Sequence, residues 1–291
     1  MSAPAPLAVL EARGHWGIKK GLDNIRGLLE GLGHPETAFP AVLLAGTNGK
    51  GSTGAFLAHA LRAAGHRVGW TTSPHLLHPR ERVWIDGAPI ASATLQRALG
   101  EVLEAEARLN LHATYFELMI AAAMVAFREG GIDLALVEVG MGGRWDSTNA
   151  LDPILTVLTN VALDHTQFLG DTRELIGREK LCTARDGRPL VLGPRLEPAW
   201  VAPLLECSPV LHPTSELPLE TLRWDHSEAG GYRLGLAGRH QVQNASTARE
   251  ALRQLDALGW SVPETAIREG FAGARWPGRL WRVPGLPDAW M

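Results

Sequence analysis

The most informative stretch of the chain reads AVLLA at 41–45, GTNGKGS at 46–52 and TGAFLAHALRAA at 53–64. The first piece is an apolar run of strand length, and the last has apolar residues at helical spacing from Phe56 to Ala64. Glycines in the middle piece let the backbone take positive φ and approach a bound anion closely. Consecutive N–H groups before a helix, together with a lysine, attract phosphate oxygens. The stretch therefore predicts a phosphate-binding loop between a strand and a helix.

The spacing inside this loop is unusual, because two residues separate Gly46 from the Gly49-Lys50 pair whereas the common P-loop has four. The alternative is a tight strand-to-helix turn with an incidental lysine. If the loop binds a nucleotide, Lys50 adds positive charge at its outer phosphates. The residues predicted to contact the nucleotide are consecutive: Thr47, Asn48, Gly49, Lys50, Gly51, Ser52 and Thr53.

Short apolar runs alternate with longer helical patterns along the rest of the chain. Further strands are expected at 68–71, 134–139, 154–159 and 190–192, and a hairpin is expected at 83–90 around Asp86-Gly87. Helices are expected at 94–109, 116–128, 171–182, 244–258 and 263–271. The proline-rich segment 194–218 is expected to be a surface excursion. Strands that alternate with helices imply βαβ units, so the predicted fold class is α/β, with a mostly parallel sheet flanked by helices.

The composition excludes several classes of protein. The 291 residues include 28 Lys and Arg against 31 Asp and Glu, so no basic excess favours a nucleic-acid partner. Hydrophobic residues make up 45%, as in globular chains, but no apolar run reaches the ~18 residues that a membrane span needs. Cys182 and Cys207 cannot make a disulfide framework, and the start of the chain lacks the basic region of a signal peptide. We therefore expect a soluble, cytoplasmic protein.

The loop GTNGKGS closely resembles that of the Mur ligase superfamily, in particular its folylpolyglutamate and dihydrofolate synthases. Further blocks typical of these enzymes follow in the family's order over nearly the whole chain: TSPHL at 72–76, TYFE at 114–117, EVGMGGR at 138–144, DSTN at 146–149, LDHT at 163–166, REK at 178–180, GRHQ at 238–241 and WPGR at 276–279. The chain is thus identified as a member of this family with a P-loop-type ATPase domain. We expect that domain to span 1–274, followed by an interdomain linker at 275–291.

The resemblance implies that Ser73, Glu138 and His165 hold a Mg²⁺ ion that bridges the nucleotide phosphates. A hydroxyl and a carboxylate suit Mg²⁺, while an imidazole is less usual for so hard a cation. Each of the three stands near the end of a predicted strand, where ligands collect in open α/β sheets. The alternatives are a helix N-cap for Ser73, a loop carboxylate for Glu138 and a helix-capping role for His165.

Lys180 lies in the helix predicted at 171–182, where a lone lysine is usually exposed. In the family, the corresponding lysine is carbamylated by CO₂, and its new carboxylate helps to hold a second metal ion together with His165. The resemblance therefore implies two Mg²⁺ sites and catalytic roles for Lys50, His165 and Lys180. The Leu-Cys pair after Lys180 departs from the small residues usual in the family.

Four residues correspond to positions that contact the pteroate group in the family: Thr114, Phe116, Asp146 and Ser147. Phe116 could stack on a pterin ring, and Asp146 could hydrogen-bond its amino-pyrimidine edge. The alternatives are core packing for Phe116 and an N-cap or Asx-turn role for Asp146. A glycine-flanked segment near 15–22 resembles the family's mobile loop beside the pterin.

Three residues complete the nucleotide side by resemblance: Gln241, Asn244 and Arg279. Asn244 also stands at the expected start of a helix, so N-capping is its alternative. Arg279 lies in the predicted linker, where the family uses an arginine to contact ATP phosphates.

The resemblance implies an ATP-dependent amide ligase of folate metabolism. The γ-phosphoryl group of ATP moves to the carboxylate of dihydropteroate or of a folate's terminal glutamate, and the amine of L-glutamate then displaces phosphate from the acyl phosphate. One alternative is a natural single-domain relative that binds nucleotide or pterin without ligating. Another is a Mur-type ligase that acts on a cell-wall peptide. We expect a monomer whose partners are these small molecules.

The family's pattern continues beyond the linker with an Asp-Gly-Ala-His-Asn-Pro block and a C-terminal Rossmann-like domain, which this sequence does not include. We therefore expect the 291 residues alone to have low ligase activity. The residues leave dihydrofolate synthesis, polyglutamate extension and both together as open possibilities.

Overall fold

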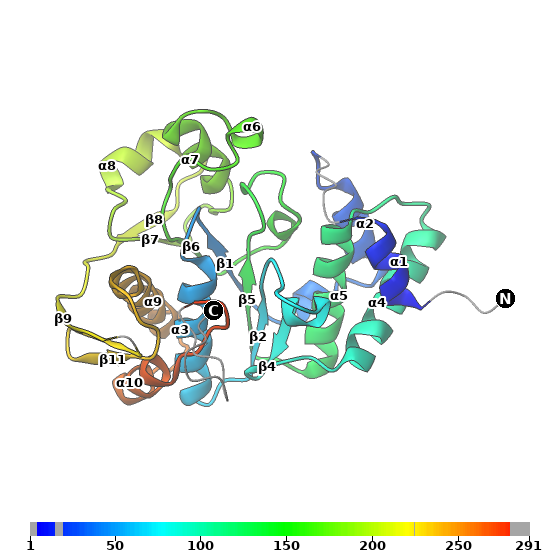
Figure 1. Cartoon of the computed structure of the whole chain (residues 1–291). Coiled ribbons are helices and arrows are strands. Elements are labelled where there is room, and N and C mark those ends of the chain that lie inside the picture. The colour runs from blue at the N-terminus through cyan, green and yellow to red at the C-terminus, as the bar shows by residue number, and fades with distance from the viewer. Residues whose placement is uncertain (1–4, 15–19, 224, 280–291) are drawn as a thin grey trace.

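An eight-stranded sheet runs through the computed structural model, which describes residues 5–14, 20–223 and 225–279 (Figure 1). The strand order is β4-β3-β2-β5-β1-β6-β7-β8, and all neighbours from β2 to β8 are parallel. The strands of this sheet are β1 (Ala41–Ala45), β2 (Val68–Thr71), β3 (Val83–Ile85), β4 (Ala88–Pro89), β5 (Leu134–Glu138), β6 (Leu155–Leu158), β7 (Pro189–Leu192) and β8 (Val210–Pro213). The predicted α/β class with a mostly parallel sheet is confirmed.

Helices cover both faces of the sheet, with α1, α2, α4 and α5 on one side and α3, α9 and α10 on the other (Figure 1). The α-helices are α1 (Pro6–Ala12), α2 (Asp23–Gly31), α3 (Lys50–Ala63), α4 (Ser92–Arg108), α5 (Tyr115–Gly130), α6 (Thr166–Leu169), α7 (Arg173–Leu181), α8 (Pro198–Val201), α9 (Arg239–Ala257) and α10 (Glu264–Gly273). Short 3₁₀ helices lie at η1 (Pro35–Ala38), η2 (Pro79–Arg82), η3 (Ser147–Ala150) and η4 (Ala202–Leu204).

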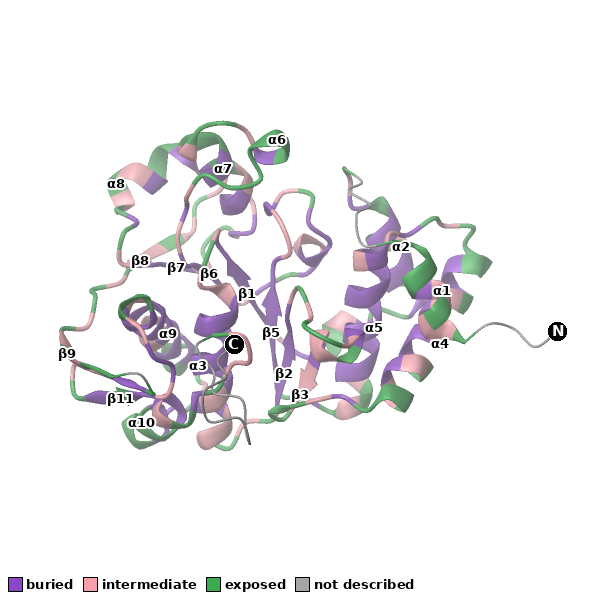
Figure 2. Ribbon diagram, viewed as in Figure 1, coloured by how far each residue is buried: buried purple, intermediate pink, exposed green. Residues whose placement is uncertain are grey.

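The central strand β1 is apolar throughout because both of its faces are covered. Ala41 and Leu43 pack in the cluster that includes residues of α2, α4 and α5. Val42 and Leu44 point the other way and pack with residues of α3, α9 and α10. All five residues of β1 are buried, and Figure 2 shows this burial along the middle of the sheet. The strand therefore lies in the middle of the molecule, and the loop after its carboxyl end runs from buried Gly46 to exposed Asn48.

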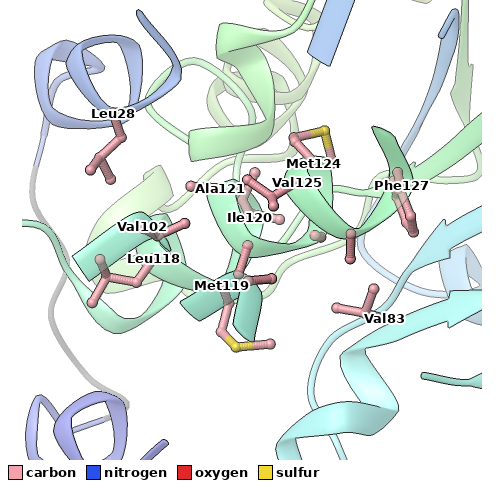
Figure 3. Packing of buried hydrophobic residues seen from close by; sticks show 14 of the residues in the cluster. Leu28, Val83, Val102, Leu118, Met119, Ile120, Ala121, Met124, Val125 and Phe127 are labelled. Atoms are coloured by element: carbon pink, nitrogen blue, oxygen red, sulfur yellow. The ribbon is translucent and has the colours of Figure 1, made fainter. Parts of the chain in front are cut away.

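Helix α5 is buried along nearly its whole length. Figure 3 shows its side chains gathered with Leu28 of α2, Val102 of α4 and Val83 of β3. The helix begins with a capping box, in which the Thr114 hydroxyl accepts a hydrogen bond from the Glu117 N–H at 3.2 Å and the Glu117 carboxylate accepts one from the Thr114 N–H at 2.7 Å. Thr114 thus has a structural role at the start of this helix.

The predicted hairpin at 83–90 is confirmed as β3 and β4. Asp86 and Gly87 both have positive φ, 52° and 83°, as a two-residue turn with the twist of the strands requires. The other predicted strands also appear, each within about one residue of its expected start, a margin normal for element boundaries.

Two expectations for the second half of the chain are wrong. The segment 194–218 is not only a surface excursion, because it contains α8, η4 and the edge strand β8, which pairs with β7. Strand β8 reads VLHP and lacks the alternation that would mark it. Helix α9 begins at Arg239 rather than 244. The sequence pattern missed its first turn because that turn is mostly polar and shows no apolar periodicity. Asn244 is therefore inside the helix, and its N-cap alternative is wrong.

A second, antiparallel sheet was not predicted. Its strands, in the order β11-β10-β9, are β9 (Leu219–Leu222), β10 (Ser227–Ala229) and β11 (Tyr232–Leu234). They are too short for a sequence pattern, yet Ala229, Tyr232 and Leu234 are buried in the same cluster as α9 and α10. None of the helices in the described ranges combines the length and apolarity needed to cross a bilayer.

Parts of two predictions lie outside the described residues. These are positions 15–19 of the loop expected near 15–22, and positions 280–291 of the linker expected at 275–291. The domain boundary predicted at 274 stays a prediction. It falls one residue after the end of α10.

Candidate active site

The loop between β1 and α3 is held by the two residues that follow the neighbouring strand β6, Thr159 and Asn160. Asn48 donates its N–H to the Asn160 side-chain oxygen at 2.8 Å, and Thr47 donates its N–H to the Asn160 carbonyl at 3.1 Å. The Thr159 hydroxyl donates to the Asn48 carbonyl at 2.6 Å. The predicted loop is therefore a fixed structure with its backbone held from one side.

Gly46 and Gly49 give this loop its shape. Their φ angles are 143° and 85°, in the region that favours glycine. A side chain at either position would also clash with a neighbouring residue. A Cβ at Gly46 would lie 1.9 Å from the Thr159 hydroxyl oxygen, and one at Gly49 would lie 2.3 Å from the Asn244 side-chain oxygen. Helix α3 then starts at Lys50, three residues earlier than its apolar pattern begins, because Gly49 serves as its N-cap.

Two lysines converge on one carbonyl of this loop. Lys50 Nζ donates to the Gly46 carbonyl at 3.0 Å and to the Thr47 carbonyl at 3.2 Å. Lys180 Nζ, which comes from α7, donates to the same Gly46 carbonyl at 3.2 Å. Lys180 is buried, so its alternative as an exposed helix residue is wrong. Two ammonium groups at one loop make a strongly anion-attracting site.

Burial and the charge of Lys50 lower the pKa of Lys180 to about 8, against the opposing effect of Asp164 and Asp146. An amine with this pKa spends a substantial fraction of its time neutral near physiological pH.

Glu138 stands at the end of β5 with its carboxylate buried. Burial raises its pKa to about 7, although Lys50, the Ser73 N–H, Arg279 and Arg82 all act to lower it. The Ser73 N–H donates to the carboxylate at 3.4 Å, so the structure brings Ser73 and Glu138 together. No helix follows Ser73 directly, and its N-cap alternative is wrong. A buried carboxylate with one long hydrogen bond fits a divalent cation as its partner.

His165 is not assembled into this group. It stands before α6 with φ of 48°, and its side chain is 49% exposed beside Asp164, with 3.7 Å between Nε2 and Oδ2. His165 is the N-cap residue of α6, as its helix-capping alternative predicted, but its side chain makes no cap hydrogen bond. Within the described ranges, no three His, Cys, Asp or Glu side chains form a group that could hold a metal ion. The Mg²⁺ set of Ser73, Glu138 and His165 stays a prediction.

Phe116 and Asp146 meet across Gly140. A Cβ at Gly140 would lie 2.8 Å from the Phe116 ring and 3.0 Å from Asp146 Oδ2. Both carboxylate oxygens of Asp146 are used by the chain, with the Thr148 N–H and hydroxyl at 3.0 and 2.6 Å and the Met141 N–H at 2.9 Å. Asp146 thus caps η3, as its alternative predicted, and burial raises its pKa.

Ser147 is buried in η3, and Phe116 is half-buried at the edge of the core cluster. Contact of Thr114, Phe116, Asp146 and Ser147 with a pteroate group stays a prediction.

Asn244 reaches the loop between β1 and α3, residues 46–49, from the second turn of α9. We call this loop the phosphate loop after its predicted ligand. The Asn244 side-chain N–H donates to the Gln241 side-chain oxygen at 2.8 Å, and its own oxygen faces Gly49. Gln241 is fully buried, and its Nε2 has no partner in the described structure. Arg279 is exposed, and its charge acts on both Glu138 and His240. The structure therefore gathers these residues beside the loop.

Sequence reasoning missed Thr159, Asn160 and Arg82. The first two follow the apolar run of β6, next to β1 in the sheet, and polar residues at the carboxyl end of a neighbouring strand are the signal that could have found them. Arg82 is half-buried, lies over the Tyr115 ring at 5.2 Å and acts on Glu138. It follows the TSPHL block without a pattern of its own.

The chain is also similar to known proteins. Residues 44–182 match the Mur ligase middle domain. The chain is 34% identical to the dihydrofolate synthase/folylpolyglutamate synthase of Bacillus subtilis (strain 168), over 97% of this chain and 70% of that protein. It is 36% identical to the enzyme of the same name from Escherichia coli (strain K12), over 93% of this chain and 64% of that protein.

Solved structures give the same answer. The chain matches the apo form of L. casei FPGS with a TM-score of 0.86 and 32% identity, over 96% of this chain and 73% of that one. It matches E. coli FolC in complex with DHPP and ADP with a TM-score of 0.83 and 34% identity, over 97% of this chain and 69% of that one.

The parallel sheet, the glycine loop with its lysine and the matched middle domain define an ATP-dependent ligase of the Mur ligase type. Within that class, the chain belongs to the dihydrofolate synthase/folylpolyglutamate synthase family, whose members are ATP-dependent glutamate ligases in folate metabolism.

Proposed function

We propose that this chain binds MgATP at the β1–α3 loop and supports transfer of the γ-phosphoryl group to a pteroate or folate carboxylate, followed by amide formation with L-glutamate. The observation that carries the proposal is the convergence of Lys50 and Lys180 on the Gly46 carbonyl beside buried Glu138. Solved relatives bind ADP, AMPPCP, folate and L-glutamate, which supports a folate substrate over a cell-wall peptide.

The chain's own groups mainly position the phosphates and balance their charge. The N–H groups at the N-terminus of α3 donate hydrogen bonds to the phosphate oxygens, and Lys50 turns from the loop carbonyls to the γ-phosphate. Arg279 adds a second positive charge from the segment after α10. Asn244 keeps Gly49 in place from α9. These groups stabilise charge that shifts during phosphoryl transfer.

We assign Ser73, Glu138 and His165 to one Mg²⁺ and Lys180 with His165 to a second. Bound Mg²⁺ would supply charge neutralisation at the phosphate oxygens. Glu138 and Ser73 fit this role, because the buried carboxylate already lies beside the Ser73 N–H. His165 would join them from its exposed position.

We also propose that Lys180 is carbamylated. The ammonium first loses one proton to solvent. The neutral amine then attacks CO₂, a C–N bond forms and a second proton leaves to solvent, so that a cation becomes a carboxylate. Its lowered pKa, about 8, supplies the neutral amine. A carbamate resonance in ¹³C NMR spectra of the protein under ¹³CO₂, absent in Lys180→Ala, is expected; identical spectra for the two proteins would contradict it.

The proposed partners are small molecules, namely ATP, a pteroate or folate, and L-glutamate. We propose a monomer in the cytoplasm, where these substrates meet.

Binding of the Mg²⁺ complex of AMPPCP, an ATP analogue that keeps a γ-phosphate, tests the nucleotide site when it is measured by titration calorimetry. Lys50→Ala is expected to weaken binding by at least about tenfold, since one charge-assisted phosphate contact is lost. Arg253→Ala serves as the control, because this arginine forms a surface ion pair with Glu250 on α9, with exposed fractions of 62% and 14%. Equal affinity of Lys50→Ala and the wild type would refute the phosphate assignment of the loop.

A further inference from the structure

Three tryptophans form a stack that the site described so far does not use. The ring centroids of Trp70 and Trp276 are 4.5 Å apart, those of Trp84 and Trp276 are 5.6 Å apart, and those of Trp70 and Trp84 are 5.9 Å apart. Trp70 and Trp84 belong to the paired strands β2 and β3, whereas Trp276 belongs to the segment after α10. The stack therefore joins that segment to the sheet.

Helix α3 makes room for this stack with two glycines on one face. Gly51 and Gly54 are three residues apart, so they are neighbours on the helix surface. A Cβ at Gly51 would lie 2.9 Å from Trp276 Nε1 and 3.3 Å from Cε2, and one at Gly54 would lie 2.8 Å from Trp70 Nε1. Neither glycine has positive φ, so what the helix uses here is their small size.

The position of Trp276 links the stack to the nucleotide loop. Gly51 directly follows Lys50 and belongs to the first turn of α3. Three residues after Trp276, Arg279 carries a charge that acts on Glu138 and His240. The Trp276 indole thus packs the segment 274–279 against the first turn of α3, whose N–H groups would donate to bound phosphates.

We propose that Trp276 is a positioning residue for the nucleotide. Its ring, seated on Gly51 and packed against Trp70 and Trp84, holds the segment after α10 against the phosphate loop and keeps Arg279 beside the site. Nucleotide affinity therefore depends on the packing contact between the Trp276 ring and Gly51. This inference rests on the proposed function, because it requires that the loop binds a nucleotide.

The first test is Trp276→Leu, with Trp260→Leu as the matched control. Trp260 packs on His66 with 5.3 Å between ring centroids, and His66 lies beyond the opposite end of α3. Trp276→Leu is expected to weaken MgADP binding about tenfold, the loss of one or two aromatic contacts. Dihydropteroate affinity and the melting temperature should change no more than in Trp260→Leu. MgADP should also alter tryptophan emission in the wild type and in Trp260→Leu, and not in Trp276→Leu.

The second test is a double-mutant cycle with Gly51→Ala and Trp276→Ala. Gly51→Ala alone should weaken MgADP binding, because the new methyl group displaces the indole. In the Trp276→Ala background the methyl group has space, so Gly51→Ala should change the Kd less than about threefold. Additive effects in a wild type that binds MgADP would overturn the inference and leave the proposed function standing. A wild type that binds no MgADP would overturn both.

Discussion

The phosphate loop and the loop of His165 both follow strands at the carboxyl edge of the sheet, yet the chain holds them differently. In the phosphate loop, Thr47, Asn48 and Lys50 all have hydrogen-bond partners within the protein. In the other loop, the Asp164 and His165 side chains are 46% and 49% exposed and pair with each other. The phosphate loop has its polar groups paired within the folded protein, whereas the loop of His165 leaves its ionisable groups in solvent.

The difference teaches which parts of such a site the polypeptide can preorganise alone. Backbone donors aimed at an anion are fixed by strands and by glycine geometry, and they cost no rearrangement when the anion arrives. Side chains meant for a cation repel one another or need solvent until the ion is present, so the ion takes part in ordering them. Substitution of a glycine in the first loop should therefore act on folding as well as on ligand binding, and substitution of an exposed side chain in the second on ligand binding alone.

The largest effect is expected for Gly46→Ala. The methyl group would meet the Thr159 hydroxyl at 1.9 Å, at a φ of 143°. We expect the free energy of unfolding to fall by about 3 kcal/mol or more and MgADP binding to be lost. Urea unfolding and calorimetry measure both.

Gly187→Ala is the matched control for this substitution. Gly187 also has positive φ, 67°, but a Cβ there has nothing within 4 Å. Its cost should be about 1 kcal/mol, with MgADP binding unchanged. If both variants lost the same stability, backbone conformation alone would explain Gly46, and the role given to Thr159 would be wrong.

A smaller effect, of opposite sign, is expected for Glu138→Gln. The pKa of Glu138 is raised from 4.5 to about 7 in the folded protein, so folding favours its protonated form. The contribution of this group to stability is full below pH 4.5 and is lost as pH rises through about 7. In metal-free buffer at pH 8, Glu138→Gln should exceed the wild type in stability by on the order of 2 kcal/mol, and near pH 4 by little.

Urea unfolding at several pH values checks this prediction, with Glu269→Gln on the exposed face of α10 as the control. Parallel pH profiles for the wild type and Glu138→Gln would show that burial does not penalise the Glu138 carboxylate. The same variant should lose Mg²⁺-dependent nucleotide binding, which would separate its stabilising effect on folding from its role in the site.

The smallest effect on stability is expected for His165→Ala. An exposed side chain contributes little to folding, so the free energy of unfolding should change by no more than about 0.5 kcal/mol. The enhancement of ADP binding by Mg²⁺ should fall at least about tenfold, as for loss of a metal ligand. A loss of stability above about 2 kcal/mol would mean that this loop is held by folding after all, and the contrast drawn here would fail.

The sequence predicted the sheet and the phosphate loop because both depend on local patterns. The apolar run of β1 and the glycines after it need no distant partner to be recognised. The placement of Lys180 depends on the contact between α7 and the loop after β5. Gly143 of that loop packs so tightly on α7 that an added Cβ would lie 2.5 Å from the Glu179 carbonyl oxygen. That contact joins residues far apart in the chain, so only the family resemblance pointed to Lys180.

Helix α9 and the tryptophan stack show a second limit. The first turn of α9 carries Arg239, His240 and Gln241 before the first core residue, Val242, so the apolar periodicity starts late. Trp70, Trp84 and Trp276 have no regular spacing, since their meeting depends on β2, β3 and the segment after α10 coming together. Residues that serve a site and not the core break the patterns on which sequence predictions depend.

The Gly46 carbonyl, which accepts hydrogen bonds from two lysines, gives the loop a way to exchange partners. In the proposed mechanism Lys50 leaves it for a phosphate; the Lys180 nitrogen would then still donate to the same oxygen, and a carbamylated Lys180 would keep one N–H for this purpose. A buried carbonyl stripped of all donors would resist that departure. Lys180 would thus keep the Gly46 carbonyl hydrogen-bonded, which lowers the free-energy cost of moving Lys50 to a phosphate.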